Sequence, residues 1–302
     1  MSLSAKRRLI LIQDIAPYRF RNEFRDTQDV VMHATDPVFA FENRTVLCRQ
    51  NEDGTYSFPA VREVLDGGTD TDLLLYLFAE ERGAERRNYY LYRSHDTQES
   101  LAVQGYTYTN ISAFRSAGPK NDWFACMSAF HLFCWYKDTR FCGRCGSRME
   151  YYHKERAMIC RKCGNIVYPR LNPAVIVGVT KGDSILLTRY AGRAYGGNAL
   201  VAGFTEIGET LEQTVAREVM EETGIHVKNI RYYGSQPWGL ASDILMGFYC
   251  DAQDGEDILM DENELAAAKF VRRDELGEEN RNVSLTADMI MNFKEKGRLV
   301  FR

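Results

Sequence analysis

Three stretches of this 302-residue chain have hydrophobic patterns that predict regular structure. In "NPAVIVGVTKGDSILLTRY", residues 172–190, two β-branched apolar runs flank the turn "KGD", which predicts two paired strands. In "SLTADMIMNFKEKG", Ser284 precedes an apolar run and Gly297 follows it, which predicts a capped helix. Residues 123–137, "WFACMSAFHLFCWYK", have the apolar content of a helix.

Residues 1–125 have a different pattern, with short apolar runs such as "VVMHATDPVFAF" separated by turn-like stretches such as "QNEDGTYS" and "AGPKND". This pattern predicts an α+β unit. No combination of residues in it suggests catalysis. His33, His95 and His131 stand far from obvious partners, so we interpret each as a surface or packed histidine rather than a ligand.

A fourth pattern covers "GFTEIGETLEQTVAREVMEETGI", residues 203–225. Thr210 and Gln213 fit a capping box and Gly224 fits a C-terminal stop, so residues 211–222 are predicted to be helical. At about 100° per residue, one face of this helix is apolar and is expected to be buried. That face would consist of Val215, Ala216, Val219 and Met220.

Three glutamates share the adjoining edge of this predicted helix, because Glu218, Glu221 and Glu222 stand at positions i, i+3 and i+4. Ionised carboxylates held that close raise one another's pKa unless cations neutralise them. Such hard oxygen ligands suit Mg²⁺ or Mn²⁺, which also bind phosphate oxygens. The alternative from spacing alone is a solvated acidic face.

Four of the eight cysteines form two knuckles, "CGRCG" and "CRKCG", separated by fourteen residues. This arrangement is typical of a tetrahedral zinc site. Because four thiolates leave no coordination position open, such a zinc would be structural. The alternative is a pair of disulfides. The expected ligands are Cys142, Cys145, Cys160 and Cys163, whereas Cys48, Cys126, Cys134 and Cys250 are scattered and are interpreted as packed thiols.

Composition narrows the class of protein. The hydrophobic content of 45% and the charged content of 26% are ordinary for a globular protein, and the formal charge of −4 argues against an overall polybasic nucleic-acid or membrane binder. No stretch reaches the roughly 18 apolar residues of a membrane span, and the N-terminal run is too short for a signal peptide. We therefore expect a cytoplasmic protein that does not associate with membranes.

The acidic stretch resembles the Nudix box at every defining position. The matching residues are Gly203, Glu209, Arg217, Glu218, Glu221, Glu222 and Gly224, with aliphatic Val219 and Ile225 between and after them. The resemblance implies an α/β/α sandwich around a mixed sheet that hydrolyses a nucleoside diphosphate linked to another group. It implies that Glu218, Glu221 and Glu222 bind divalent metal and that Arg217 and Glu209 orient those carboxylates.

Two further residues are expected at such a site. The backbone carbonyl of Ala202 matches a position that often adds a metal ligand. In "LMDENELAAAKF", Glu264 matches a distal acid that ligates metal or acts as general base. The alternative for Glu264 is an exposed loop acid.

A four-cysteine ribbon ahead of the box, and "SQPW" at 235–238 after it, resemble the NADH pyrophosphatase family. These typically homodimeric enzymes cleave NAD(H) to nicotinamide mononucleotide and AMP, and some remove NAD caps from RNA. The resemblance implies that Tyr168 and Phe204 sandwich a base and that Gln236 and Trp238 help to select the substrate. We expect a Nudix-like α+β domain at 1–125, a linker helix and zinc ribbon at 126–169, and a catalytic Nudix domain at 170–302.

The chain departs from this family after "SQPW". Where the family has Pro-Phe-Pro, one residue and Ser, this chain has Gly239, Leu240, Ala241, Ser242 and Asp243. A more flexible loop is expected, with Asp243 available to a ribose hydroxyl and repelling an added phosphate. Two other functions stay open. One is a Nudix pyrophosphatase for ADP-ribose, FAD or a related nucleotide, and the other is an RNA-binding module, because residues 137–170 contain nine Lys/Arg and three Asp/Glu.

Overall fold

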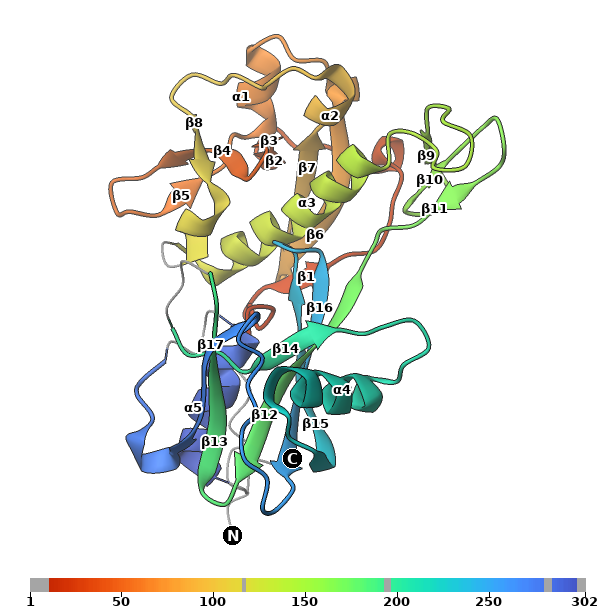
Figure 1. Cartoon of the computed structure of the whole chain (residues 1–302). Coiled ribbons are helices and arrows are strands. Elements are labelled where there is room, and N and C mark those ends of the chain that lie inside the picture. The colour runs from red at the N-terminus through yellow and green to blue at the C-terminus, as the bar shows by residue number, and fades with distance from the viewer. Residues whose placement is uncertain (1–10, 116–117, 193–196, 280–283, 298–302) are drawn as a thin grey trace. The chain divides into compact units, whose positions relative to one another are not determined.

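The computed structural model describes residues 11–115, 118–192, 197–279 and 284–297. These residues form two compact units (Figure 1). The sandwich unit comprises 11–14, 171–238 and the chain from 243 onward, and the ribbon unit comprises 15–170 and 239–242. Neither unit is one continuous stretch of chain.

The sandwich unit is built on a six-stranded mixed sheet with the order β15-β16-β12-β13-β17, in which β14 also pairs with β12. β12 runs parallel to β16, and the other pairs are antiparallel. A mixed sheet of this kind carries helices on both faces. The strands are β12 Asn172–Lys181, β13 Ser184–Tyr190, β14 Val201–Phe204, β15 Val227–Trp238, β16 Asp243–Ala252 and β17 Leu265–Arg272.

The alternation of side chains along β12 gives this unit two cores. Val175, Val177 and Val179 pack with α4, Leu211–Thr223, on one face of the sheet. Ile176, between them, packs on the other face with α5, Leu285–Lys296. Because successive strand residues point to opposite faces, one strand can serve both helices. Figure 1 shows the helices on opposite sides of the sheet, which confirms the predicted α/β/α sandwich.

The predicted helix ends are confirmed. Thr210 accepts a hydrogen bond from the Gln213 amide and Gln213 accepts one from the Thr210 amide, as a capping box requires, while Gly224 adopts φ 67° at the C-terminus of α4. Ser284 caps α5, and Gly297 follows it. The turn "KGD" joins β12 to β13 as predicted.

The predicted apolar face of α4 is only partly right. Val215 and Val219 are fully buried, but Ala216 is exposed and Met220 is half-buried. Thr214, Glu222 and Thr223 are buried instead. The buried face of α4 is therefore rotated relative to the predicted one. The two buried threonines satisfy their hydroxyl groups within the helix, because Thr214 donates to the Thr210 carbonyl and Thr223 donates to the Val219 carbonyl.

The ribbon unit contains two small four-stranded sheets and the three-stranded sheet of the cysteine knuckles. The long helix α3, Lys120–Asp138, includes the predicted helix 123–137 and buries most of its length, with aromatic contacts such as Phe41–Phe130. The remaining elements are β1 Arg19–Arg21, β2 Val38–Phe39, β3 Phe41–Glu42, β4 Thr45–Gln50, β5 Tyr56–Ser57, α1 Val61–Asp66, β6 Leu74–Arg82, β7 Glu85–Tyr92, α2 Ser94–Thr97, β8 Thr107–Asn110, β9 Glu150–Tyr152, β10 Ala157–Ile159 and β11 Ile166–Val167, with short 3₁₀ helices between some of them. None of the helices in the described part of the chain is both long and apolar enough to cross a membrane.

One glycine of β12 fits the core of the sandwich unit only because it lacks a side chain. A Cβ on Gly178 would lie 2.6 Å from Cδ1 of Tyr249, on the neighbouring strand β16. The Tyr249 ring cannot retreat, because it is 1% exposed and its hydroxyl donates to the Met289 carbonyl of α5 at 2.6 Å. This contact connects the sheet to α5.

We therefore expect Gly178→Ala to destabilise the protein by about 1–3 kcal/mol, because overpacking displaces the Tyr249 ring. Denaturant unfolding is the measurement, with Gly277→Ala as the matched control, since a Cβ there meets no atom within 4 Å. Equal stability of the two variants would contradict the tight packing of Gly178 against Tyr249.

Candidate metal and pyrophosphate site

The four cysteines of the two knuckles converge on one point. Their sulfur atoms all lie within 4.8 Å of one another, the only such group of possible ligand atoms in the described ranges. Cys142 and Cys163 have their Sγ atoms 3.6 Å apart, and Cys145 and Cys160 have theirs 3.5 Å apart. Four sulfurs at about 2.3 Å from a central zinc would be about 3.8 Å from each other. A disulfide needs about 2.05 Å, so the alternative pairing is wrong.

The two knuckles have the same backbone geometry. Gly146 donates to the Cys142 carbonyl and Gly164 to the Cys160 carbonyl, each at 2.8 Å. Both glycines have positive φ, 71° and 70°, which a side chain would disfavour. Hydrogen bonds from the backbone and side chain of Ser147 lower the pKa of Cys145 to about 6. The turn thus favours the thiolate, which is the metal-binding form.

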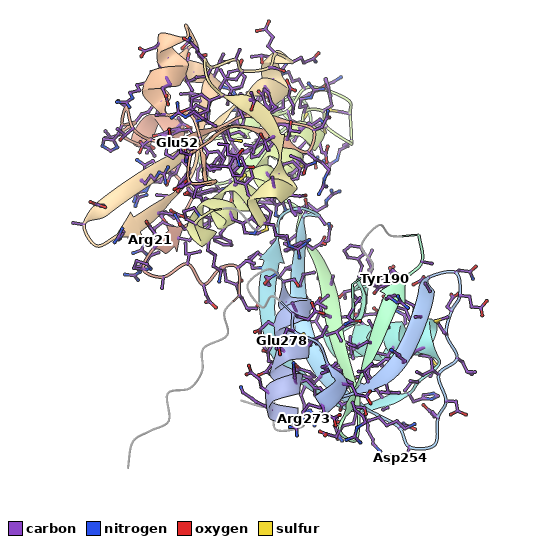
Figure 2. The ribbon with its side chains drawn as sticks, turned by 90° about the vertical axis from the view of Figure 1, so that its left-hand side faces the viewer. Arg21, Glu52, Tyr190, Asp254, Arg273 and Glu278 are labelled. Atoms are coloured by element: carbon purple, nitrogen blue, oxygen red, sulfur yellow. The ribbon has the colours of Figure 1, made fainter. Side chains whose placement is uncertain are left out.

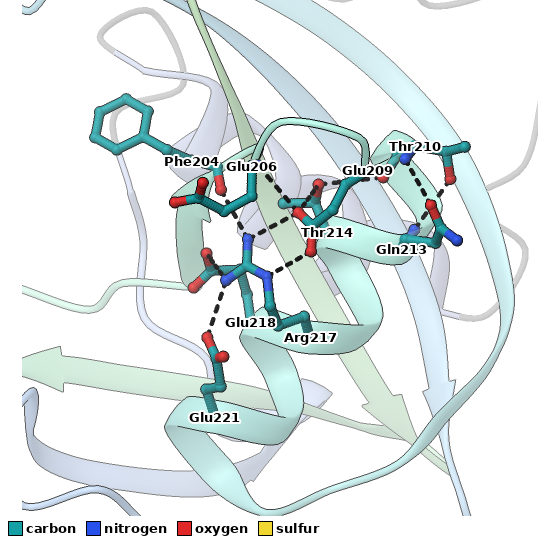
Figure 3. A network of polar contacts seen from close by, with 9 residues as sticks. All are labelled: Phe204, Glu206, Glu209, Thr210, Gln213, Thr214, Arg217, Glu218 and Glu221. Carbon is teal, nitrogen blue, oxygen red and sulfur yellow. Dashed lines mark hydrogen bonds and ion pairs between the residues drawn. The ribbon is translucent and has the colours of Figure 1, made fainter.

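Arg217 lies at the centre of the predicted carboxylate site on α4 (Figure 3). It contacts Glu209 twice, from Nε to Oε1 at 2.6 Å and from Nη2 to Oε2 at 2.9 Å. Its Nη2 also donates to the Phe204 carbonyl at 2.9 Å. The hydrogen bonds from Arg217 lower the pKa of Glu209 to about 2. This bidentate pair fastens the loop that joins β14 to α4.

The same guanidinium reaches two of the predicted metal ligands. Nη1 of Arg217 donates to Glu218 Oε1 at 2.7 Å and to Glu221 Oε2 at 2.9 Å. The Glu221 side chain is 59% exposed, whereas that of Glu218 is 12% exposed. Burial raises the pKa of Glu218, against the opposing effect of Arg217.

Glu222 is the most deeply buried of the three carboxylates, at 2% exposure. Its Oε2 atom has no hydrogen-bond partner among the described residues. Burial, followed by the charges of Glu218 and Glu264, raises its pKa to about 8. Buried carboxylates are normally paired with a positively charged side chain or coordinate a metal. The positively charged side chains of this site therefore do not balance its negative charge.

Glu264, which precedes β17, acts electrostatically on the helix carboxylates. Its charge contributes to the raised pKa of both Glu218 and Glu222. Its side chain is exposed, and its backbone is fixed by bonds to Asp261 and Ala191. The structure thus brings Glu264 near the α4 carboxylates.

Tyr190 is a site residue that the sequence analysis missed. It ends β13 (Figure 2), and its hydroxyl lies 3.3 Å from Glu222 Oε1 and 3.4 Å from the Ala202 carbonyl. Its hydrogen bond opposes the rise in the pKa of Glu222. No spacing in the sequence connects residue 190 to the acidic helix, because only the pairing of strands brings them together.

Gly203 allows the sheet and α4 to approach closely at this site. A Cβ at this position would lie 2.0 Å from the carboxyl carbon of Glu218. The next residue, Phe204, is 54% exposed and presents its ring at the end of β14. A side chain at position 203 would therefore clash with Glu218, which explains why the predicted box has glycine there.

The residues predicted to select the substrate lie at the hairpin of β15 and β16. Gln236 is 0% exposed, yet neither its Nε2 nor its Oε1 has a partner in the described part of the chain. Trp238 is half-buried, and Asp243, opposite it, is 6% exposed and accepts from Asn172 Nδ2 at 3.3 Å. Asp243 is therefore held within the protein rather than displayed on an open loop.

The hairpin tip 239–242, where a more flexible loop is predicted, belongs to the ribbon unit. A Cβ on Gly239 would lie 2.3 Å from the Met127 carbonyl oxygen of α3. Proline, which the resembled family has at this position, could not be accommodated without moving that backbone. Tyr168, also in the ribbon unit, is 54% exposed and donates to Glu155 at 2.8 Å.

We expect one tightly bound zinc per chain, because the four thiols have the separations that a tetrahedral ion requires. Cys142→Ser should lower the zinc content to below about half and destabilise the ribbon by a few kcal/mol. Elemental analysis and thermal unfolding measure both effects, with Cys134→Ser, outside the knuckles, as control. Full zinc retention in Cys142→Ser would contradict the assignment.

Glu222 should make stability depend on pH when no Mg²⁺ or Mn²⁺ is present. Its folded-state pKa of about 8 lies above the ordinary 4.5, so ionisation opposes folding increasingly as the pH rises between these values. Glu222→Gln should therefore stabilise the protein little below pH 4.5 and by a few kcal/mol above pH 8. Thermal unfolding of zinc-loaded protein across this range is the measurement. The exposed Glu212→Gln, on the same helix, should show no such trend, and a pH-independent difference for Glu222→Gln would refute ionisation of this carboxyl as the cause.

Comparisons with known proteins match two segments of the chain. Residues 170–293 match the NUDIX domain model, and residues 137–168 match the model of the NADH pyrophosphatase zinc ribbon domain. A Nudix hydrolase structure from Nitrosomonas europaea is 26% identical, with a TM-score of 0.47, and the match covers 54% of this chain and 96% of that one.

Two similar proteins are named NAD-capped RNA hydrolase NudC. The one from Klebsiella pneumoniae is 46% identical over 141 residues, covering 47% of this chain and 54% of that protein. The one from Vibrio vulnificus is 49% identical over 137 residues, covering 45% and 52%. The chain thus spans about half the length of the curated relatives it matches. The chain thus carries a NUDIX domain at residues 170–293 and, ahead of it at residues 137–168, a zinc ribbon of the NADH pyrophosphatase type.

Proposed function

We propose that this protein is a divalent-metal-dependent pyrophosphohydrolase that cleaves NAD(H) to nicotinamide mononucleotide and AMP, and that NAD-capped RNA is also a substrate. The observation that carries the proposal is the buried Glu222 carboxylate, with an unpartnered oxygen, beside Glu218 and near Glu264. The names of the similar proteins support the choice of substrate.

The donor set fits a hard divalent cation. Glu218, Glu221 and Glu222 supply carboxylate oxygens, the Ala202 carbonyl lies on the adjoining strand, and Glu264 adds a further charge. A bound Mg²⁺ or Mn²⁺ would neutralise the phosphates and lower the pKa of a water molecule. The pKa values of Glu218 and Glu222 are raised, because burial and the neighbouring carboxylates disfavour their charged forms and too little positive charge lies nearby to offset this. In the structure Arg217 supplies part of that charge, so it competes with a cation for Glu218 and Glu221.

The chain's own residues have distinct tasks in this proposal. Arg217 and Glu209 hold the β14–α4 loop, and with it the Phe204 ring, in place. Glu264 is exposed and can accept a proton from an attacking water molecule, as a general base must. No covalent nucleophile is needed, because water attacks one phosphorus and the other phosphate departs.

Substrate selection would depend on the hairpin of β15 and β16. The Gln236 amide is buried and unpartnered, so it can offer both a donor and an acceptor to a bound nucleotide. The exposed ring of Phe204 can stack on a base, and Tyr168 is proposed as its counterpart. Trp238 and Asp243, which pair across the strands, are proposed to shape this end of the pocket.

Several wider features belong to the same proposal. The zinc is proposed to be structural, and we retain the domain boundaries 1–125, 126–169 and 170–302. A homodimer and a cytoplasmic location are also proposed, and the location is consistent with eight cysteines, all within the described residues, of which none is in a disulfide. A function limited to RNA binding is disfavoured, because the α4 carboxylates would repel an RNA backbone unless cations neutralise them.

If the carboxylates hold catalytic cations, hydrolysis of NADH should require added Mg²⁺ or Mn²⁺. Glu221→Gln should lower turnover by about 10²–10³-fold, because it removes a ligand of the cation whose charge would stabilise the transition state. The exposed side chain makes this substitution compatible with the fold. Steady-state assays with each metal are the measurement.

Glu212→Gln serves as the control, because it removes an exposed carboxylate from the first turn of the same helix. The assay panel comprises NADH, NAD⁺, ADP-ribose, FAD and NAD-capped RNA. Undiminished turnover in Glu221→Gln would exclude the metal assignment. A preference for ADP-ribose or FAD over NADH would leave the chemistry intact and overturn the proposed substrate.

A further inference from the structure

A second candidate binding site lies wholly within the ribbon unit. A cavity of about 480 Å³ opens where the β9–β10 hairpin of the ribbon meets residues 24–32, the start of β6 and the end of α3. Its volume is within the range of small-molecule sites. No task in the proposed hydrolysis uses any residue that lines it.

Arg156, in the turn between β9 and β10, is the main cation of this cavity. Its Nη1 donates to the Asn22 side-chain oxygen at 3.0 Å, and its Nη2 donates to the Leu77 carbonyl. Both acceptors are neutral, and Arg156 forms no ion pair with any described residue. Burial lowers its pKa, which reflects the cost of holding a charge in this place. Three of its five N–H donors stay available to a ligand.

The other charged residues of the cavity are largely engaged. Arg93 pairs with Asp96 at 2.6 Å, and Asp26 pairs with His153. Arg25 contacts Glu23 only at 3.8 Å. Asp72 is the exposed acid of the rim. Arg156 therefore provides an uncompensated positive charge, which favours an anion.

The apolar and aromatic lining indicates that this anion carries a ring. The rings of Tyr136 and Tyr151 lie 5.4 Å apart, and Arg93 lies over Tyr151 at 4.5 Å. Tyr136 is 4% exposed, and its hydroxyl has no hydrogen-bond partner among the described residues. Phe24 and Leu74 extend this wall. Inorganic phosphate would leave the wall unused, whereas a nucleobase could pack against it.

We propose that this cavity binds a nucleoside 5′-monophosphate, with the phosphate on Arg156 and the base against the half-buried rings of Tyr151 and Phe24. The guanidinium supplies the planar fork that phosphate oxygens match, and the Tyr136 hydroxyl supplies a further donor. Binding at this cavity requires neither hydrolysis nor the α4 carboxylates. Evidence against the proposed enzymatic function would therefore leave this second proposal unaffected, and the reverse also holds.

The test is isothermal titration of the zinc-loaded full-length protein with AMP, without Mg²⁺ or Mn²⁺. Arg156→Gln should weaken binding at this site about tenfold. Tyr136→Phe, which removes only the hydroxyl, should weaken it a few-fold. Lys154→Gln is the matched control, because it removes an exposed charge from the same turn and should leave binding unchanged. Zinc content and unfolding temperature verify that each variant is folded.

Two further ligands test the chemistry. Adenosine and inorganic phosphate should each bind at least about tenfold more weakly than AMP, because each lacks half of the recognised structure. A 5′-phosphorylated RNA trinucleotide distinguishes the sources of the ligand. Tighter binding of the trinucleotide than of AMP, lost in Arg156→Gln, would identify an RNA end, and weaker binding would identify the free mononucleotide. Equal AMP affinities in folded Arg156→Gln and Lys154→Gln, or equal affinities for AMP and phosphate, would overturn the proposal.

Discussion

The guanidinium of Arg217 is the constraint on which the site depends. It bonds to the Glu209 carboxylate, to the Phe204 carbonyl and to the carboxylates of Glu218 and Glu221, so it joins the end of β14, the following loop and two turns of α4. A planar fork with five donors can satisfy acceptors in these directions, whereas an ammonium group would satisfy fewer. Without Arg217 the loop would lose its attachment to α4, and the three carboxylates would lose the positive charge that lies between them.

The sandwich fold makes this concentration of charge tolerable. β12 places valines under α4 and an isoleucine under α5, so hydrophobic burial on both faces of the sheet holds the helices in position. The unfavourable burial of Glu222 is therefore opposed by apolar packing close to it. Gly203 removes the one side chain that would keep α4 from approaching the sheet. Apolar packing on both faces of the sheet thus surrounds a carboxylate cluster that is confined to one edge of α4.

Sequence reasoning was most successful where function depends on spacing along the chain. The cysteine knuckles, the caps of α4 and the i, i+3 and i+4 glutamates are local patterns, and the structure contains each of them. It was less successful where distant segments meet. The burial of Thr214 and Glu222 instead of Ala216 depends on how α4 is rotated against the sheet. Tyr190 reaches Glu222 only through strand pairing, and Gly239 is confined by a carbonyl of α3 that lies more than a hundred residues earlier.

The discontinuous composition of the two units has a consequence for how the chain can be divided. Leu11 packs in the α5 core of the sandwich unit, although the ribbon unit follows it in sequence. The hairpin tip 239–242 packs with the ribbon unit, although β15 and β16 on either side belong to the sandwich. A cut at residue 170 would therefore take an apolar side chain from one core and leave Gly239 without the α3 backbone that surrounds it. Within the described residues, therefore, no single scission point would leave both the ribbon unit and the sandwich unit with their cores complete.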